Sequence, residues 1–182
     1  MREPVSLLTV PGYTNAGPHH WMSRWEADEP RFRRVQQRDW DHPTRAEWTA
    51  ALADAAAVES RPPVLVAHSL GCIAIAHLAA AGERRVAAAF LVAPADVEQA
   101  NLSALRDFAP VPLARFAFPV CVVASPDDPY LGIGRAKEFA IAWGAEFHAV
   151  APCGHINSDS NLGSWATGRA LLDNFLHRHR IE

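Results

Sequence analysis

Short apolar runs alternate with helix-like segments along almost the whole 182-residue chain. Six runs have the length of buried strands, namely Val5–Val10, Phe32–Val35, Val64–Ala67, Val86–Val92, Val120–Ala124 and Glu146–Val150. Phe32–Val35 is the weakest of them, and the arginines that flank it are typical of an edge strand. Strands that alternate with helices of about 10–15 residues predict βαβ units, and therefore a parallel sheet with helices on both faces.

Helix signals fill most of the segments between these runs. Thr44-Arg45-Ala46-Glu47 follows a proline and has the form of a capping box, which opens an alanine-rich helix. The expected helices are residues 19–27, 44–58, 70–81, 102–108, 134–143 and 164–178. Right-handed crossovers then make the fold a doubly wound, mainly parallel α/β sheet of about six strands. The chain has no repeat or linker, so we expect a single domain over residues 1–182.

Composition excludes several classes of protein. Apolar residues make up 49% of the chain and charged residues 20%, which excludes a disordered polypeptide. The formal net charge is −3, so nothing favours a nucleic-acid partner. One basic cluster stands out and is typical of a solvated edge: Arg31, Arg33, Arg34 and Arg38. No apolar run approaches the ~20 residues that span a bilayer, so we expect no membrane association.

Signals for metals, cofactors and export are weak. The three cysteines form neither a zinc motif nor a disulfide framework, which favours a reducing compartment: Cys72, Cys121 and Cys153. Three histidines suit no compact zinc site either: His19, His20 and His42. The first apolar stretch is too short for a signal peptide. We therefore expect a cytoplasmic protein without metal or cofactor.

A serine occupies the junction between the third expected strand and its helix. Ala67-His68-Ser69-Leu70-Gly71 resembles the G-x-S-x-G turn that projects a nucleophilic hydroxyl above a sheet, with alanine at the first small position. Small residues are needed there because the turn brings their backbones close together. Alone, the pentad would favour Ser69 as a helix N-cap residue.

The order of partners along the chain favours catalysis. Asp127 or Asp128 follows the fifth strand and His155 the last, which gives the Ser…Asp…His order of the α/β-hydrolase triad. The serine needs a base, and the imidazole needs a carboxylate to fix its tautomer. The proline after Asp128 restricts that residue, whereas Asp127 can accept backbone N–H groups in an Asx-turn. Asp96 is a further candidate for the acid.

An acyl-transfer site also needs two backbone N–H groups directed at the developing negative charge. Leu70, at the helix N-terminus, is the first candidate because the helix dipole adds to its effect. The loop after the first strand supplies the second, from Gly12 or Tyr13.

Four residues are candidates for lining the pocket. His20 and Trp21 could form its floor, although support from behind the site is the simpler role. Phe108 and Phe116 lie in the irregular segment 96–119, which in so short a chain is all that remains to cover the site. We therefore expect an open pocket that prefers short acyl chains.

Several motifs together resemble a known family. Pro11-Gly12, Gly17-Pro18-His19-His20-Trp21 and Trp25-Glu26 are similar to the N-terminal signature of the small YdeN-type serine hydrolases, a family that includes a mammalian retinoblastoma-binding protein. The resemblance continues through His68-Ser69, Ser125-Pro126-Asp127-Asp128-Pro129 and Cys153-Gly154-His155. It implies a compact α/β-hydrolase fold without a large cap domain, esterase-type activity, and Asp128, directly before proline, as the acid. The chain has no Leu-x-Cys-x-Glu, so retinoblastoma binding is not implied.

The expected function is therefore that of an esterase-like serine hydrolase acting on a small-molecule ester. Ser69 would attack the carbonyl, His155 would act as base and then acid, and Asp128 would orient the imidazole. Leu70 with Gly12 or Tyr13 would stabilise the oxyanion, and water would release the acyl group. The alternative is a non-catalytic interaction protein that retains the fold and the pocket, since one scaffold hosts both enzymes and binders.

Overall fold

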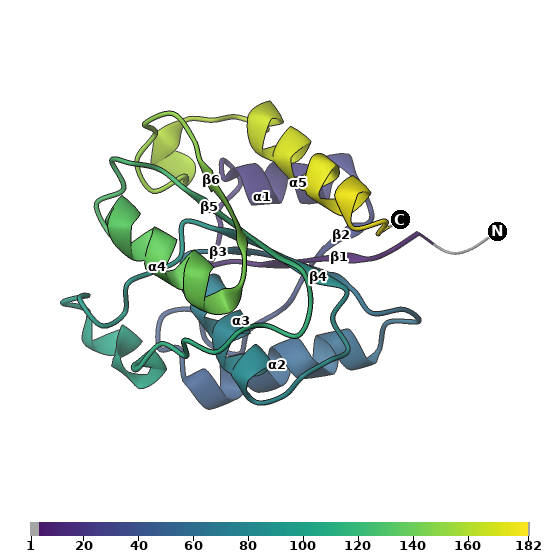
Figure 1. The fold of residues 1–182 in the computed structure, drawn as a ribbon, viewed down its shortest axis with the longest axis horizontal. Coiled ribbons are helices and arrows are strands. Elements are labelled where there is room, and N and C mark those ends of the chain that lie inside the picture. Colours follow the sequence, from purple (N-terminus) through teal and green to yellow (C-terminus); the bar gives the residue numbers. More distant parts are fainter. Residues whose placement is uncertain (1–3, 182) are drawn as a thin grey trace.

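A computed structural model describes residues 4–181, which form a six-stranded, entirely parallel sheet in the order β2-β1-β3-β4-β5-β6 (Figure 1). The strands are β1 (Leu7–Val10), β2 (Phe32–Arg34), β3 (Val64–His68), β4 (Ala88–Val92), β5 (Val120–Ala124) and β6 (Glu146–Ala149). All six expected strands are present, and their ends differ from the expected ones by at most two residues.

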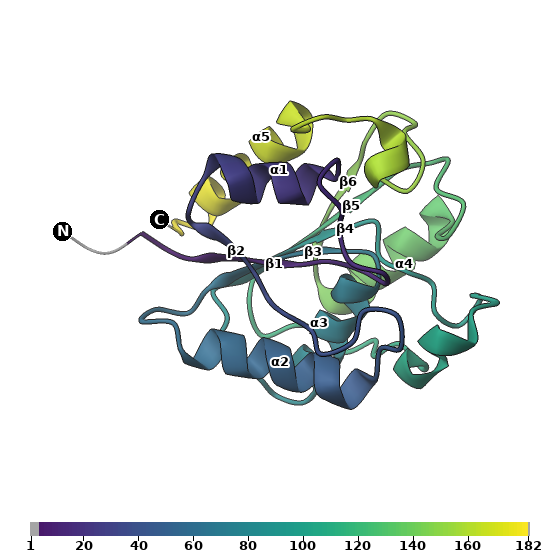
Figure 2. The same cartoon turned by 180° about the vertical axis from the view of Figure 1, so that it is seen from behind.

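Five α-helices cover the two faces of this sheet within residues 4–181. They are α1 (Trp21–Asp28), α2 (Arg45–Ala57), α3 (Leu70–Ala80), α4 (Ile133–Trp143) and α5 (Ala166–Arg178). The helices α1 and α5 lie on one face, and α2, α3 and α4 lie on the other (Figures 1 and 2). The doubly wound architecture is therefore confirmed. Among the described residues, no helix is long and apolar enough to cross a membrane.

The irregular segment between β4 and β5 contains one short helical turn. The helix expected at residues 102–108 is a 3₁₀ helix, Ser103–Phe108. A second 3₁₀ turn, Ser158–Ser160, precedes α5 and was not expected from the sequence. Neither turn is long enough to form a cap domain, in agreement with the compact fold expected.

Side chains of each strand alternate between two apolar clusters, one on each face of the sheet. In β4, Ala88, Phe90 and Val92 join the cluster under α1 and α5, while Ala89 and Leu91 join the cluster under α2, α3 and α4. All five are completely buried. Burial on both faces explains why the strands appear as continuous apolar runs in the sequence.

The arginines around the edge strand β2 are paired with carboxylates. Arg34 is the most buried of them and also donates to the side chain of Asn15 and the carbonyl of Ala16, which ties the loop after β1 to β2. The four ion pairs are Arg31–Glu29, Arg33–Glu59, Arg34–Glu26 and Arg38–Glu47. The basic cluster is thus an ion-paired edge, although Arg34 is less solvated than expected.

The strand order reverses between β1 and β3, because β2 lies to one side of β1 and all later strands lie to the other. Open α/β sheets bind ligands beyond the carboxyl ends of the strands at such a point. Two glycines there allow the start of α3 to lie close to the end of β1 and the loop that follows it. A Cβ on Gly71 would lie 2.3 Å from the carbonyl oxygen of Val10, and a Cβ on Gly12 would lie 2.8 Å from the Cβ of Ser69.

Replacing Gly71 by alanine should destabilise the protein, because the new methyl group would meet the backbone of β1, which cannot rotate away. Overpacking of a core costs about 1–3 kcal/mol, and we expect the upper part of that range. Urea denaturation measures the change in the free energy of unfolding. Gly134→Ala is the control, since nothing lies within 4 Å of that position in α4. Equal effects of the two substitutions would contradict the packing argument.

Candidate active site

The backbone of Ser69 is strained. Its φ of 54° and ψ of −121° lie in a region that residues with a side chain rarely adopt. The turn is fixed by hydrogen bonds to the β4 end, from Ser69 N to the Val92 carbonyl at 3.0 Å and from Ala95 N to the Ser69 carbonyl at 3.3 Å. The Ser69 side chain makes no capping hydrogen bond to α3, so it is not used as a helix cap.

The Ser69 hydroxyl instead contacts an imidazole that is held by a carboxylate. Ser69 Oγ lies 2.9 Å from His155 Nε2, and His155 Nδ1 lies 2.8 and 3.0 Å from the two oxygens of Asp128. A carboxylate only accepts hydrogen bonds, so Nδ1 carries the proton and Nε2 is free to accept the serine proton. Asp96, the further candidate acid, lies 3.7 Å from Arg135 instead.

The two adjacent aspartates after β5 have different partners. Asp127 Oδ1 accepts hydrogen bonds from Ser125 Oγ at 2.6 Å and from the backbone N–H groups of Cys153 and Gly154 at 2.9 Å each. These donors, Ser125 first, lower the pKa of Asp127. Asp127 therefore holds the backbone just before His155, and Asp128 contacts the imidazole itself.

The residues suggested for an oxyanion hole belong to the start of α3 and to the loop after β1. Leu70 is the first residue of α3, so its N–H has no acceptor within the helix. A Cβ on Gly12 would lie 3.3 Å from the Leu70 nitrogen, which places the loop after β1 directly beside it. Within residues 4–181, neither Gly12 nor Tyr13 donates its backbone N–H to another protein group. The structure thus places Gly12 in contact with the start of α3.

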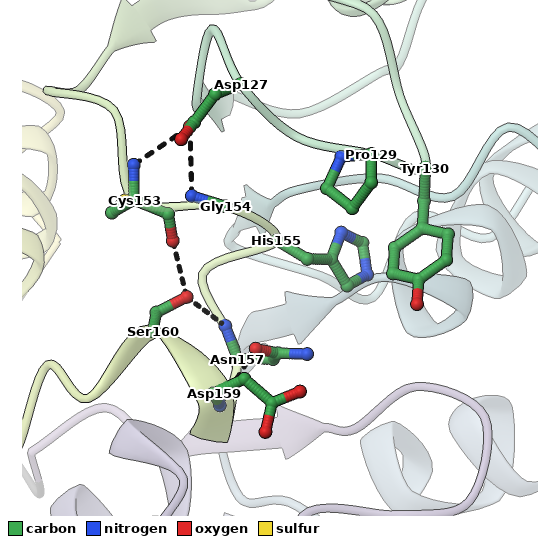
Figure 3. Close-up of a pocket in the computed structure, with 9 residues that line it drawn as sticks. All are labelled: Asp127, Pro129, Tyr130, Cys153, Gly154, His155, Asn157, Asp159 and Ser160. Atoms are coloured by element: carbon green, nitrogen blue, oxygen red, sulfur yellow. Dashed lines mark hydrogen bonds between the residues drawn. The ribbon is translucent and has the colours of Figure 1, made fainter.

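A cavity of about 390 Å³ opens beside His155 (Figure 3). The ring of Tyr130 stands edge-on to the His155 ring, with centroids 4.8 Å apart, and is 61% exposed. The lining residues are Asp127, Pro129, Tyr130, Cys153, Gly154, His155, Asn157, Asp159 and Ser160. Tyr130, Asn157 and Asp159 were not among the predicted site residues, although each lies within four residues of Asp128 or His155.

His20 and Trp21 do not line this cavity and support the His155 loop instead. Trp21 Nε1 donates to the carbonyl of Ile156 at 2.8 Å. The His20 ring packs edge-on against His68, with centroids 4.8 Å apart. Both side chains are buried, which agrees with the supporting role that the sequence favoured over the pocket floor.

Phe108 and Phe116 do not line the cavity, contrary to expectation. Phe108 is completely buried, and its ring lies 5.8 Å from that of Trp48. Phe116 packs against Trp143 at the last turn of α4, at the amino end of the strands. A large apolar ring stabilises the folded protein most when it is fully removed from water, and the core under α2, α3 and α4 provides that burial.

Burial makes the three thiols poor nucleophiles. It raises the pKa of Cys72 well above its ordinary value, that of Cys121 to about 12, and that of the cavity-lining Cys153 to a smaller extent. Thiols react as thiolates, so none of the three competes with Ser69. Within residues 4–181, no three His, Cys, Asp or Glu side chains are grouped so that they could hold a metal ion.

The chain was compared with known proteins. The sequence model of a family described as serine hydrolase matches residues 7–174. The chain belongs to this serine hydrolase family. A YdeN-like hydrolase from Pectobacterium atrosepticum is 29% identical, with 97% of this chain and 92% of that one covered and a TM-score of 0.87. The YdeN-type resemblance is thereby confirmed, and no curated protein matches the sequence.

More distant members of the fold also match this serine hydrolase. The ydeN gene product of B. subtilis is 21% identical, with 95% of this chain and 99% of that one covered and a TM-score of 0.74. Est1E from Butyrivibrio proteoclasticus is 13% identical, with 94% and 89% covered and a TM-score of 0.67. At these identities the likeness shows the α/β-hydrolase fold alone.

Acidification should destabilise the protein through His20. Burial, with smaller contributions from Arg34 and His155, lowers the pKa of His20 from 6.5 to about 4. Between these values the unfolded chain binds a proton that the folded one does not, so stability is lost as the pH falls from about 6.5 to about 4. At about 1.4 kcal/mol per pH unit, the loss reaches about 3 kcal/mol.

Urea denaturation at several pH values tests this expectation. His20 also caps α1, since its Nδ1 accepts the N–H of Met22 at 3.2 Å. His20→Asn is therefore the informative variant, because asparagine can still cap the helix but does not titrate. The slope of the unfolding free energy against pH should fall by the amount expected for about one proton taken up on unfolding. An unchanged slope would show that His20 is not the group responsible.

Proposed function

We propose that the protein is an esterase-like serine hydrolase in which Ser69 is the nucleophile. The observation that carries the proposal is the continuous hydrogen-bonded chain from the Ser69 hydroxyl through His155 to Asp128. A serine hydroxyl is too weakly acidic to attack a carbonyl without a base, and this arrangement supplies one in the correct tautomer. Membership of the serine hydrolase family agrees with this chemistry.

The proposed reaction has two stages, acylation of Ser69 and hydrolysis of the acyl group. As Ser69 Oγ attacks the ester carbonyl, its proton passes to His155 Nε2, and Asp128 stabilises the imidazolium that forms. The N–H of Leu70 and one from Gly12 or Tyr13 stabilise the oxyanion. His155 then gives the proton to the departing alcohol, which leaves an acyl group on Ser69. A water molecule, activated by His155, releases the acid.

The cavity beside His155 is proposed to hold the leaving group, because His155 must reach the departing oxygen to protonate it. Its size of about 390 Å³ suits a small group, and its lining includes the polar side chains of Asn157, Asp159 and Ser160. No cap helix lies in the segment between β4 and β5, where a long acyl chain would need cover. A small, polar alcohol and a short acyl group are therefore the proposed substrate class.

Ser69→Ala decides between a hydrolase and a binding protein that retains the fold. A fluorophosphonate probe should label the wild-type protein at Ser69, and the substitution should abolish both labelling and the hydrolysis of a short p-nitrophenyl ester. Loss of a triad member lowers kcat by about 10⁴-fold or more. Labelling that survives the substitution, or that maps to Ser125, Ser158 or Ser160, would overturn the assignment.

Asp128→Asn and Asp127→Asn form a matched pair of isosteric substitutions at neighbouring positions. Asp128→Asn should lower kcat by up to about 10⁴-fold, because an amide favours the wrong imidazole tautomer. Asp127→Asn keeps an oxygen that can accept from Cys153 and Gly154, so kcat should fall far less. Both are measured on one ester. An inactive Asp127→Asn beside an active Asp128→Asn would exchange the two roles.

A further inference from the structure

His68 joins the loops of the proposed nucleophile and base beneath the site. It is the last residue of β3 and directly precedes Ser69. Its Nε2–H donates to the backbone carbonyl of His155 at 2.9 Å. Because β4 and β5 separate β3 from β6 in the sheet, no ladder hydrogen bond fixes the two loops relative to each other. A side chain that crosses between them can do so.

The His155 loop has a backbone that needs such support. Ile156 has a φ of 50°, in the left-handed region that β-branched residues avoid. Strain of this kind persists only where the surroundings over-determine the conformation. His68 and Trp21 supply that determination, since they donate to the two successive carbonyls of His155 and Ile156, at 2.9 and 2.8 Å.

The surroundings of His68 keep its imidazole neutral. Its ring lies between those of His20 and His155, with centroids 4.8 Å away on each side. Burial first, and then the nearby His155 and His20, lower its pKa well below the ordinary value. A neutral His68 retains its Nε2–H as a donor and places no positive charge beside His155 when that residue takes up a proton.

We infer that His68 is a positioning residue, whose hydrogen bond to the His155 carbonyl sets the distance between the Ser69 hydroxyl and the His155 imidazole. The inference rests on the proposed function, because the two groups that it positions are the proposed nucleophile and base. His68 acts through the backbone of His155 and is not itself a catalytic residue. A misplacement of about 1 Å between reacting groups lowers a rate about 10²-fold.

The chain offers a matched control for this hydrogen bond. His77, in α3, also donates Nε2–H to a backbone carbonyl, that of Phe108 at 2.8 Å, but it contacts none of the triad residues. His68→Phe and His77→Phe each keep a planar aromatic ring and remove one imidazole–carbonyl hydrogen bond. His68→Gln is the conservative variant, since its amide N–H reaches the place of the imidazole Nε2.

Hydrolysis of a short p-nitrophenyl ester is measured for each variant at a temperature where circular dichroism shows it folded. We expect His68→Phe to lower kcat by about 10–100-fold with KM nearly unchanged, and His68→Gln to restore most of kcat. His77→Phe should lower the unfolding midpoint but keep the wild-type kcat. A wild-type kcat in His68→Phe, or equal losses in His68→Phe and His68→Gln, would overturn the role of His68.

The proton between His155 Nδ1 and Asp128 gives a second readout, through its downfield NMR resonance. The signal should broaden in His68→Phe and stay as in the wild type in His77→Phe; an unchanged signal in both would contradict the inference.

If His68→Phe does not fold, His68→Asn replaces it, because its amide is one methylene too short to reach the His155 carbonyl. Wild-type activity that survives Ser69→Ala would overturn the proposed function, whereas Ser69-dependent activity unaffected at His68 overturns only this inference.

Discussion

The close contact between the start of α3 and the end of β1 is the constraint on which the site depends. Gly71 packs against the carbonyl of Val10 and Gly12 against Ser69, at the point where the strand order reverses. Any side chain at either position would separate the turn at Ser69 from the loop after β1. The same contact brings the loop after β1 beside Ser69 and the backbone nitrogen of Leu70. Both the packing of the sheet and the geometry of the site therefore require that positions 12 and 71 carry no side chain.

The strained residues of the site are held by ordered neighbours. Ser69, Ala93 and Ile156 all have positive φ, and all three follow strands at the carboxyl edge of the sheet. Each is anchored by a hydrogen bond to a strand or a helix: Ser69 N to Val92 in β4, Ala93 N to Val123 in β5, and the Ile156 carbonyl to Trp21 in α1. Strain of about 1–3 kcal/mol per residue can be sustained because the parallel ladder beneath is continuous and dry.

The fold could be predicted from the sequence, and so could the meeting of Ser69 with His155, because both depend on local patterns. The choice of Asp128 over Asp127 also needed the resemblance to a known family. Apolar runs of strand length specify β3 to β5 whatever surrounds them, and the Ser…Asp…His order follows from which residues end the strands. Phe108 and Phe116 were misplaced because an aromatic residue in an irregular segment carries no periodicity that says which face it joins. The contacts of Tyr130, Asp127 and His68 with the His155 loop depend on how distant strands align, which no local pattern encodes.

The two adjacent aspartates show how one short loop contacts both the ring of a histidine and the backbone just before it. Asp127 lies in the turn that follows β5, and Asp128 comes directly after that turn. Asp127 reaches the N–H groups of Cys153 and Gly154, while Asp128 reaches the ring of His155. Two neighbouring negative charges are tolerable because each has donors of its own. With the backbone held by one carboxylate and the ring by the other, the imidazole can neither shift nor rotate without breaking a charge-assisted hydrogen bond. The loop after β5 thereby fixes the imidazole of His155 relative to the sheet.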